Sequence, residues 1–120
     1  MSQYVETPTK AFTAGAAIAK HLRVKLSSGK LAVAGVGASD EPVEIGTMED
    51  ASFADLDVVS VRLRNAQGTV KMVAAEAISA GVVVYGAASG KVADTSSGAQ
   101  IGIALEAALA DGDVIEVLRV

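Results

Sequence analysis

Two pairs of aspartates are spaced as ligands of a hard cation could be: Asp55 with Asp57, and Asp111 with Asp113. Each pair places two carboxylates one residue apart within a short segment. A calcium ion takes about six to eight oxygen ligands, and neither segment continues into the Asp-x-Asp-x-Asp-Gly spacing of a calcium-binding loop. Aspartate side chains that accept hydrogen bonds from their own turn explain this spacing without an ion. We therefore expect turns here, with no metal and no cofactor.

Two Ser-Gly-Lys tripeptides, at 28–30 and 89–91, resemble the end of a phosphate-binding loop. That loop requires an earlier glycine, a serine or threonine after the lysine, and a helix beyond it. Leu31 and Val92 follow the two lysines instead, so both tripeptides are predicted to form hairpin turns. The only histidine, His21, has no serine or cysteine nucleophile with a recognisable local signature. We expect no enzymatic activity.

The elements that position these residues are written twice in the chain. The segment IGTMEDASFADLDVVSV at 45–61 recurs as IGIALEAALADGDVIEV at 101–117, with eight of seventeen positions identical. Upstream, the segments 17–31 and 77–92 also match, so that the two Ser-Gly-Lys turns correspond. Each copy has the order strand, Ser-Gly-Lys turn, strand, loop, Ile-Gly strand, aspartate-rich turn, strand. The chain is therefore predicted to hold two pseudo-repeats, at about 15–63 and 75–120.

Alternating hydrophobicity indicates strands rather than helices. In the segment 21–26, Leu22, Val24 and Leu26 alternate with polar residues, and 58–63 shows the same period of two. Such a strand has one buried face and one solvent-exposed face. The exposed face of the first segment would form a basic stripe that is either a solvated surface or a contact for an acidic partner. The residues of this stripe are His21, Arg23 and Lys25.

These patterns predict an all-β protein with at most short helices, folded as a compact barrel-like or sandwich-like domain over residues 15–120. Residues 64–74 are predicted to link the halves as a hairpin, because Asn-Ala-Gln-Gly at 65–68 precedes an apolar segment that would return as a strand. Three glycines fall where turns need positive φ: Gly29, Gly90 and Gly112. The expected core comprises Leu22, Val24, Val59, Val61, Val83, Ile101, Ile103, Ile115 and Val117.

Composition argues against several classes of protein. Hydrophobic residues make up 51% of the chain, but with two Phe, two Tyr and no Trp the core must consist mainly of small and branched aliphatic residues. The net charge of −4 argues against nucleic-acid binding, which requires a basic face. The absence of cysteine excludes disulfides and thiolate metal sites. No apolar run approaches the roughly 20 residues that span a bilayer, and no secretion signal is recognisable, so we expect a soluble protein with no membrane partner.

Residues 1–14 lie outside both copies and are predicted to form an extended N-terminal arm. Polar residues and a proline disfavour an independent fold there, whereas a few apolar residues could anchor the segment to a partner. An extended segment can bind the edge of a sheet through backbone hydrogen bonds. The alternative is a frayed terminus. The predicted docking residues of the arm are Tyr4, Val5, Pro8 and Phe12.

The second copy resembles a known protein family. The segment GVVVYGAASGKVADTSSGAQIGIALEAALADGDVIEVLRV at 81–120 is similar to the C-terminal half of the small decoration, or cement, proteins of tailed-bacteriophage capsids. The resemblance covers about residues 12–120, and the first copy departs from it at Thr47, Met48 and Leu56, where Leu56 replaces the turn glycine. The matching residues are Gly81, Val83, Gly90, Lys91, Val92, Ile101, Gly102, Ala104, Glu106, Ala107, Gly112, Asp113 and Val117.

This resemblance implies a structural protein of the virion that lies on the outer capsid surface and is made in the host cytoplasm. Such a protein would bind the major capsid protein and itself, as a homotrimer. It would reinforce the shell by cross-linking capsid subunits, because simultaneous attachment to several subunits converts weak contacts into strong binding. No catalytic signature comes with the resemblance.

Two other kinds of protein remain open as alternatives. Another β-rich virion protein, such as a tail-tube or head-fibre base domain, would share this cysteine-free composition. A small ligand-binding barrel would need convergent polar groups in an apolar pocket. The sequence shows no cluster of histidines or paired acids that would build such a pocket.

Overall fold

The computed structural model describes residues 8–35, 43–96 and 99–119. In this part of the chain the secondary structure consists of β-strands and one short 3-10 helix, with no α-helix, which confirms the predicted all-β class. The first half contains β1 (Thr9–Thr13), β2 (Arg23–Ser27), β3 (Lys30–Val33), β4 (Glu44–Met48) and β5 (Val58–Leu63). The second half contains β6 (Thr69–Val73), β7 (Val83–Gly86), the helix η1 (Ala88–Gly90), β8 (Val92–Ala93), β9 (Gln100–Ala104) and β10 (Val114–Arg119).

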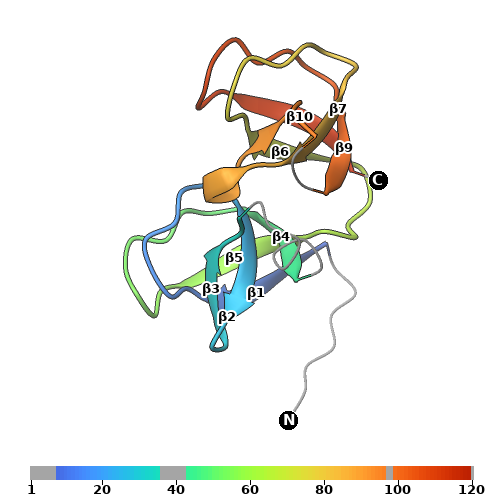
Figure 1. The fold of residues 1–120 in the computed structure, drawn as a ribbon. Helices are drawn as coiled ribbons and strands as arrows, with labels where there is room; N and C mark the ends of the chain where they lie inside the picture. The colour runs from blue at the N-terminus through green and yellow to red at the C-terminus, as the bar shows by residue number, and fades with distance from the viewer. Residues whose placement is uncertain (1–7, 36–42, 97–98, 120) are drawn as a thin grey trace.

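The strands form two five-stranded antiparallel sheets with the same connectivity. The first sheet has the order β1-β5-β4-β2-β3 and the second has the order β6-β10-β9-β7-β8. In each half a parallel bridge joins the end of the first strand to the third strand, from Ala14 to Leu31 and from Ala74 to Val92. These bridges curl each sheet toward a closed barrel, which removes most of its free edge. The protein is therefore a pair of similar barrel-like units, stacked one above the other in Figure 1.

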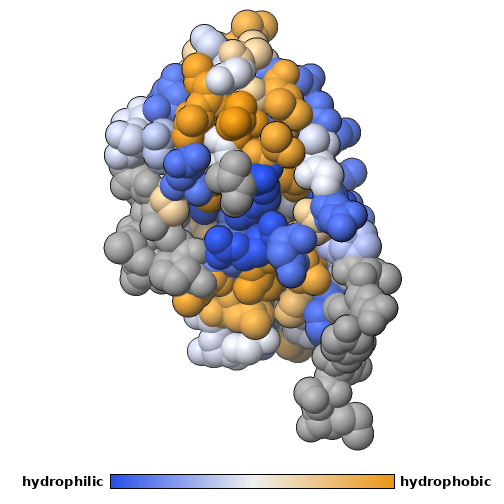
Figure 2. All heavy atoms as spheres, turned by 90° about the vertical axis from the view of Figure 1, so that its right-hand side faces the viewer, coloured by the Kyte–Doolittle hydropathy of each residue, from blue (hydrophilic) through white to orange (hydrophobic). Residues whose placement is uncertain are grey.

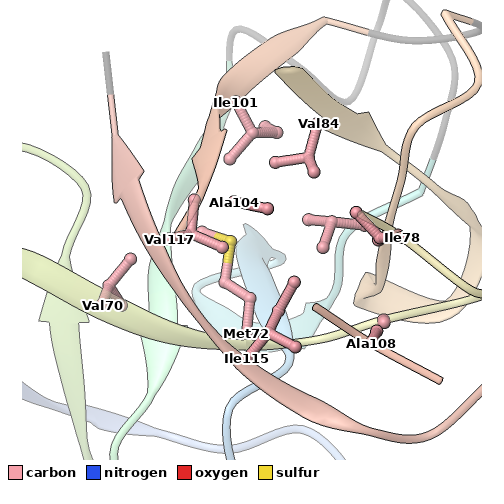
Figure 3. Close-up of a cluster of buried hydrophobic side chains, with 11 residues drawn as sticks. Val70, Met72, Ile78, Val84, Ile101, Ala104, Ala108, Ile115 and Val117 are labelled. Atoms are coloured by element: carbon pink, nitrogen blue, oxygen red, sulfur yellow. The ribbon is translucent and has the colours of Figure 1, made fainter. Parts of the chain in front are cut away.

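Each half has its own hydrophobic core, to which each of its strands contributes side chains. Val59 and Val61 of β5 are buried in the first core, and their counterparts Ile115 and Val117 of β10 are buried in the second. Figure 3 shows side chains from β6, β7, β9 and β10 converging around Met72. The predicted core residues are buried except for three that are half-buried: Leu22, Val83 and Ile103.

The connection between the halves differs from the hairpin predicted at 64–74. β6 does not return along β5 but pairs with β10, with Met72 opposite Ile115. Residues 64–68 therefore carry the chain from one sheet to the other. The repeated units begin with β1 and β6, ahead of the predicted starts at 15 and 75. The equivalence of β1 and β6 is not visible in the sequence, because TKAFT and TVKMV share only the first threonine.

Positive backbone φ angles occur at the three glycines predicted to need them. The values are 79° at Gly29, 74° at Gly90 and 95° at Gly112. In the first half, Leu56 stands at the position of Gly112 and adopts a φ of 77°. This conformation costs a residue with a side chain roughly 1–2 kcal/mol. The two aspartate-rich turns thus share one backbone shape, and the first copy forms it at a cost.

Candidate functional site

The predicted N-terminal arm is only partly covered by the structure. Tyr4 and Val5 lie outside the described residues. Pro8 is exposed, and its carbonyl accepts a hydrogen bond of 2.8 Å from the amide of Leu63. Phe12 lies in β1, pairs with Val59 of β5 and packs against the first core. Residues 9–13 of the predicted arm therefore form a strand of the chain's own first sheet.

The predicted basic stripe is not one solvent-exposed surface, because Arg23 is buried with only 1% of its surface exposed. Its guanidinium donates hydrogen bonds to three backbone carbonyls: Nε to Lys91 at 3.1 Å, and Nη2 to Ala87 at 2.8 Å and Gly35 at 3.3 Å. Two of these carbonyls belong to the second half. Arg23 does point away from the first core, as the alternation predicted, but the second half covers that face of β2.

A buried carboxylate completes this junction between the halves. Glu44 of β4 is 2% exposed and lies 3.9 Å from Nη1 of Arg23. Nη2 of Arg119, at the end of β10, donates to both oxygens of Glu44 at 3.0 and 2.9 Å. One carboxylate therefore lies between an arginine from each half. Figure 2 shows hydrophilic residues across one face at the height where the halves meet, with apolar areas above and below.

Glycines of the second half permit this close approach. A Cβ at Gly86 would lie 3.2–3.3 Å from guanidinium atoms of Arg23, and a Cβ at Gly90 would lie 2.9 Å from the Arg23 carbonyl oxygen. The amide of Gly90 also donates to the carbonyl of Ala34 at 2.8 Å. The paired arginines and Glu44 favour one register between the two barrels, because a shifted arrangement would leave a buried charge without its partner.

The other two residues of the predicted stripe have different surroundings. His21 is half-buried, has a φ of 68° and lines an open groove of about 700 Å³ between the halves. Its pKa is lowered, first by burial and then by the positive charges of Lys20 and Lys71. Lys25 is half-buried in β2, opposite Glu44 of β4. The groove is lined by Lys20, His21, Thr47, Glu49, Asp50, Arg62, Thr69, Val70, Lys71, Glu106 and Glu116.

The aspartate pairs shape two equivalent loops, at 49–57 and 105–113. In the first loop Oδ2 of Asp57 accepts hydrogen bonds from the amides of Phe53 at 2.8 Å and Ala54 at 3.1 Å. In the second loop Oδ2 of Asp113 accepts from the amides of Leu109 at 2.8 Å and Ala110 at 3.3 Å. This confirms the predicted binding to the turn backbone for Asp57 and Asp113, whereas Asp55 and Asp111 bind a different partner.

The remaining aspartate of each pair binds the lysine of the Ser-Gly-Lys turn. Nζ of Lys30 lies 3.0 Å from Oδ1 of Asp55, and Nζ of Lys91 lies 2.8 Å from Oδ1 of Asp111. The two motifs that the sequence repeats are therefore partners in each half. Exposed ion pairs of this kind contribute roughly 0–1 kcal/mol each, so they orient the loops more than they stabilise the fold.

Both loops carry exposed apolar side chains that sequence reasoning missed. Phe53 is 84% exposed, and Leu109, at the same position of the second loop, is 85% exposed. In Figure 1 both loops lie on the left-hand side of the molecule. The available signal was an apolar residue directly before each Ala-Asp-x-Asp, inside a segment predicted to be a turn. Further exposed apolar residues in or beside the loops are Leu56, Val58, Leu105 and Val114.

An interacting pair of carboxyl groups lies in the second half. The pKa of Glu76 is raised, first by a hydrogen bond with Asp94, then by desolvation and by the negative charge of Asp94. The hydroxyl of Thr95 donates to the carboxyl of Glu76 at 3.3–3.4 Å and opposes this shift.

Among residues 8–35, 43–96 and 99–119, no three histidine or acidic side chains are grouped so as to hold a metal ion. No helix in this part of the chain is long and apolar enough to span a membrane.

Comparison with known proteins gives two findings. Residues 3–119 match the sequence family described as phage cement protein. A solved structure, the N base of head fibre gp8.5 in bacteriophage phi29, superposes with a TM-score of 0.71 at 13% sequence identity, over 93% of this chain and 92% of that chain. At that identity the likeness shows a shared fold. A search of curated proteins found no match.

Proposed function

This chain belongs to the phage cement protein family, and on that basis we propose that it decorates the outer surface of a phage head by binding the major capsid protein. In this proposal the protein cross-links capsid subunits and thereby stabilises the shell. The observation that carries the proposal is the fixed duplication: two similar barrels, joined through buried ion pairs, present matched loops on one side.

Duplication supports cross-linking for a physical reason. One loop buries little area against a partner, and such a contact is weak because association costs rotational and translational entropy. When two contacts are held on one body, the second forms at a high effective concentration. A fixed pair of weak contacts therefore favours a surface where the same site recurs at a set spacing, as it does on a capsid lattice.

The proposed role is structural rather than enzymatic. The residues whose spacing suggested chemistry are engaged in the fold, since Asp57 and Asp113 bind their turns and Lys30 and Lys91 pair with aspartates. These contacts support a role in which the protein acts by binding a partner on its surface.

We propose that the protein, made in the host cytoplasm, associates with itself as a homotrimer on the head, as the family resemblance implies. We also propose that the segment ahead of β1, which includes Tyr4 and Val5, contributes a docking arm. Support comes from the position of Pro8, which is exposed at the point where the chain enters the first sheet.

A second candidate function is favoured by the shared fold with the head fibre base. In that role the chain would attach another structure to the head without reinforcing the shell. The two roles differ in their effect on the capsid. In the cement role the protein would raise the temperature or the osmotic stress that a head survives, whereas in the fibre-base role it would bind with little effect on either.

The test uses heads of the phage that encodes the chain, stripped of it and then incubated with purified protein. We expect saturable binding, measured by quantitative gel densitometry of sedimented heads, and a higher temperature of DNA release measured by calorimetry. Binding without any gain in capsid stability would favour the fibre-base role. Failure of the protein to bind heads at all would contradict both.

A further inference from the structure

The exposed apolar residues of the two loops are not required by the fold. Phe53 and Leu109 are more than four-fifths exposed, so neither side chain contributes appreciably to a core. The first residue of the strand that follows each loop is also exposed: Val58 in β5 and Val114 in β10. Isolated exposed apolar residues are ordinary on protein surfaces. Here, however, they occur at the same two positions of both copies, in segments that otherwise differ at most non-turn positions.

Both loops are held in shape by interactions that do not involve these apolar side chains. The aspartate that ends each Ala-Asp-x-Asp accepts two backbone hydrogen bonds, including one from the amide of Phe53 or Leu109 itself. The other aspartate pairs with the lysine of the neighbouring turn. Each apolar tip is thus fixed before it meets a partner, which lowers the entropy cost of binding.

The first tip extends beyond Phe53 because Leu56, 63% exposed, occupies the turn position that is Gly112 in the second loop. A leucine at a positive φ costs energy, and its side chain is exposed to solvent there. The second tip instead gains Leu105, which is 43% exposed and stands where the first loop has Glu49. Each loop, together with the first residue of the strand that follows it, therefore presents three exposed apolar side chains. These are Phe53, Leu56 and Val58 in the first half, and Leu105, Leu109 and Val114 in the second.

We propose that these two loop tips are equivalent docking knobs that insert into the same apolar recess on two neighbouring copies of the head protein. This inference rests on the proposed capsid-binding function and names the surface that performs it. A repeated partner is the occupant that the structure favours, because two rigidly joined copies of one tip match two copies of one recess. A second copy of this chain would instead place one tip in contact with a different surface, and would leave the duplication unexplained.

The test compares three variants with the unmodified protein: Phe53→Ser, Leu109→Ser and the double variant. Leu26→Ser is the matched control, because Leu26 is an exposed leucine, at 44%, in β2 and outside both loops. All four variants are expected to keep the melting temperature of the wild type, since the replaced side chains are exposed. Binding of fluorescently labelled protein to stripped heads is measured by co-sedimentation, and sedimentation velocity without heads gives the oligomeric state.

We expect each single variant to lose affinity for heads by on the order of 10²-fold, because one remaining knob lacks the advantage of simultaneous attachment. The double variant should show no saturable binding, and Leu26→Ser should bind like the wild type. Unchanged binding by the double variant would overturn this inference and leave the proposed function intact. A loss caused by one tip alone would overturn the two-site arrangement, and an altered sedimentation coefficient would assign the tips to contacts between copies of this chain. Heads that fail to bind even the wild type would overturn the proposed function itself.

Discussion

At the scale of single residues, the two turn positions Leu56 and Gly112 form a natural comparison within one chain. Both adopt positive φ, but only Gly112 does so without a side-chain penalty. Space is not the constraint, because a Cβ at Gly112 would meet nothing within 4 Å. We predict that Gly112→Ala lowers the free energy of unfolding by about 1 kcal/mol, and that Leu56→Gly does not lower it. Urea denaturation followed by circular dichroism measures both; equal destabilisation by the two changes would contradict this explanation.

The carboxyl pair of Glu76 and Asp94 predicts a dependence of stability on pH. Because the pKa of Glu76 is raised in the folded protein above its ordinary value of 4.5, the folded state binds this proton more tightly than the unfolded state. Stability from this group is therefore present at low pH and is lost as the pH rises through the folded pKa. We predict that Asp94→Asn returns the pKa of Glu76 toward its ordinary value. The loss of stability with rising pH should then be smaller in the variant than in the wild type. NMR titration of the Glu76 carboxyl carbon measures the pKa, and an unchanged value in the variant would refute the assignment.

At the scale of elements, the sequence predicts those strands whose pattern is strong and local. The alternation at 58–63 coincides with β5, and the matched loops follow from near-identical segments at 45–61 and 101–117. β1 and β6 were not predicted as equivalent strands because each is short, and their likeness lies in pairing partners rather than in residue types. The strand with which a given strand pairs depends on contacts with residues far along the chain, and the alternation of hydrophobic residues within one strand cannot specify those contacts.

Deletions separate the roles of the N-terminal segment. Removal of residues 1–7 leaves every strand of the described structure, so we predict a melting temperature within a few degrees of the wild type. Removal of residues 1–13 deletes β1, with its pairing along β5 and the packing of Phe12, and should lower the free energy of unfolding by more than about 3 kcal/mol. Calorimetry of both truncations measures the difference. Equal stability of the two would show that β1 contributes nothing to the first barrel.

At the scale of the whole molecule, the junction between the barrels was the least predictable part. The alternation along β2 correctly predicted that the side chain of Arg23 points away from the first core. The same pattern, however, fits a solvent-exposed arginine and an arginine covered by another sheet equally well. Glu44 and Arg119 are separated by 75 residues, so nothing local marks them as partners. A charged residue on a polar face becomes structural only when a second unit excludes water from it, and that depends on the relative placement of the units.

Replacement of Arg23 tests what this junction contributes to the fold. Arg23→Met keeps much of the side-chain volume but removes the guanidinium donor from the carbonyl of Ala87. The carbonyl of Lys91 loses one of its two hydrogen bonds, and Glu44 keeps its ion pair with Arg119. Removing one partner from a buried charged network costs about 3–5 kcal/mol, so the melting temperature should fall. Because each barrel has its own core, calorimetry should also show a broadened or divided transition where the wild type shows one. Lys71→Met, which removes the charge of an exposed lysine on β6, is the control and should change the transition far less. A single sharp transition at the wild-type temperature in Arg23→Met would mean that other contacts hold the barrels together. The fixed spacing on which two-site docking depends would then have to come from the chain segment 64–68, which connects the two sheets.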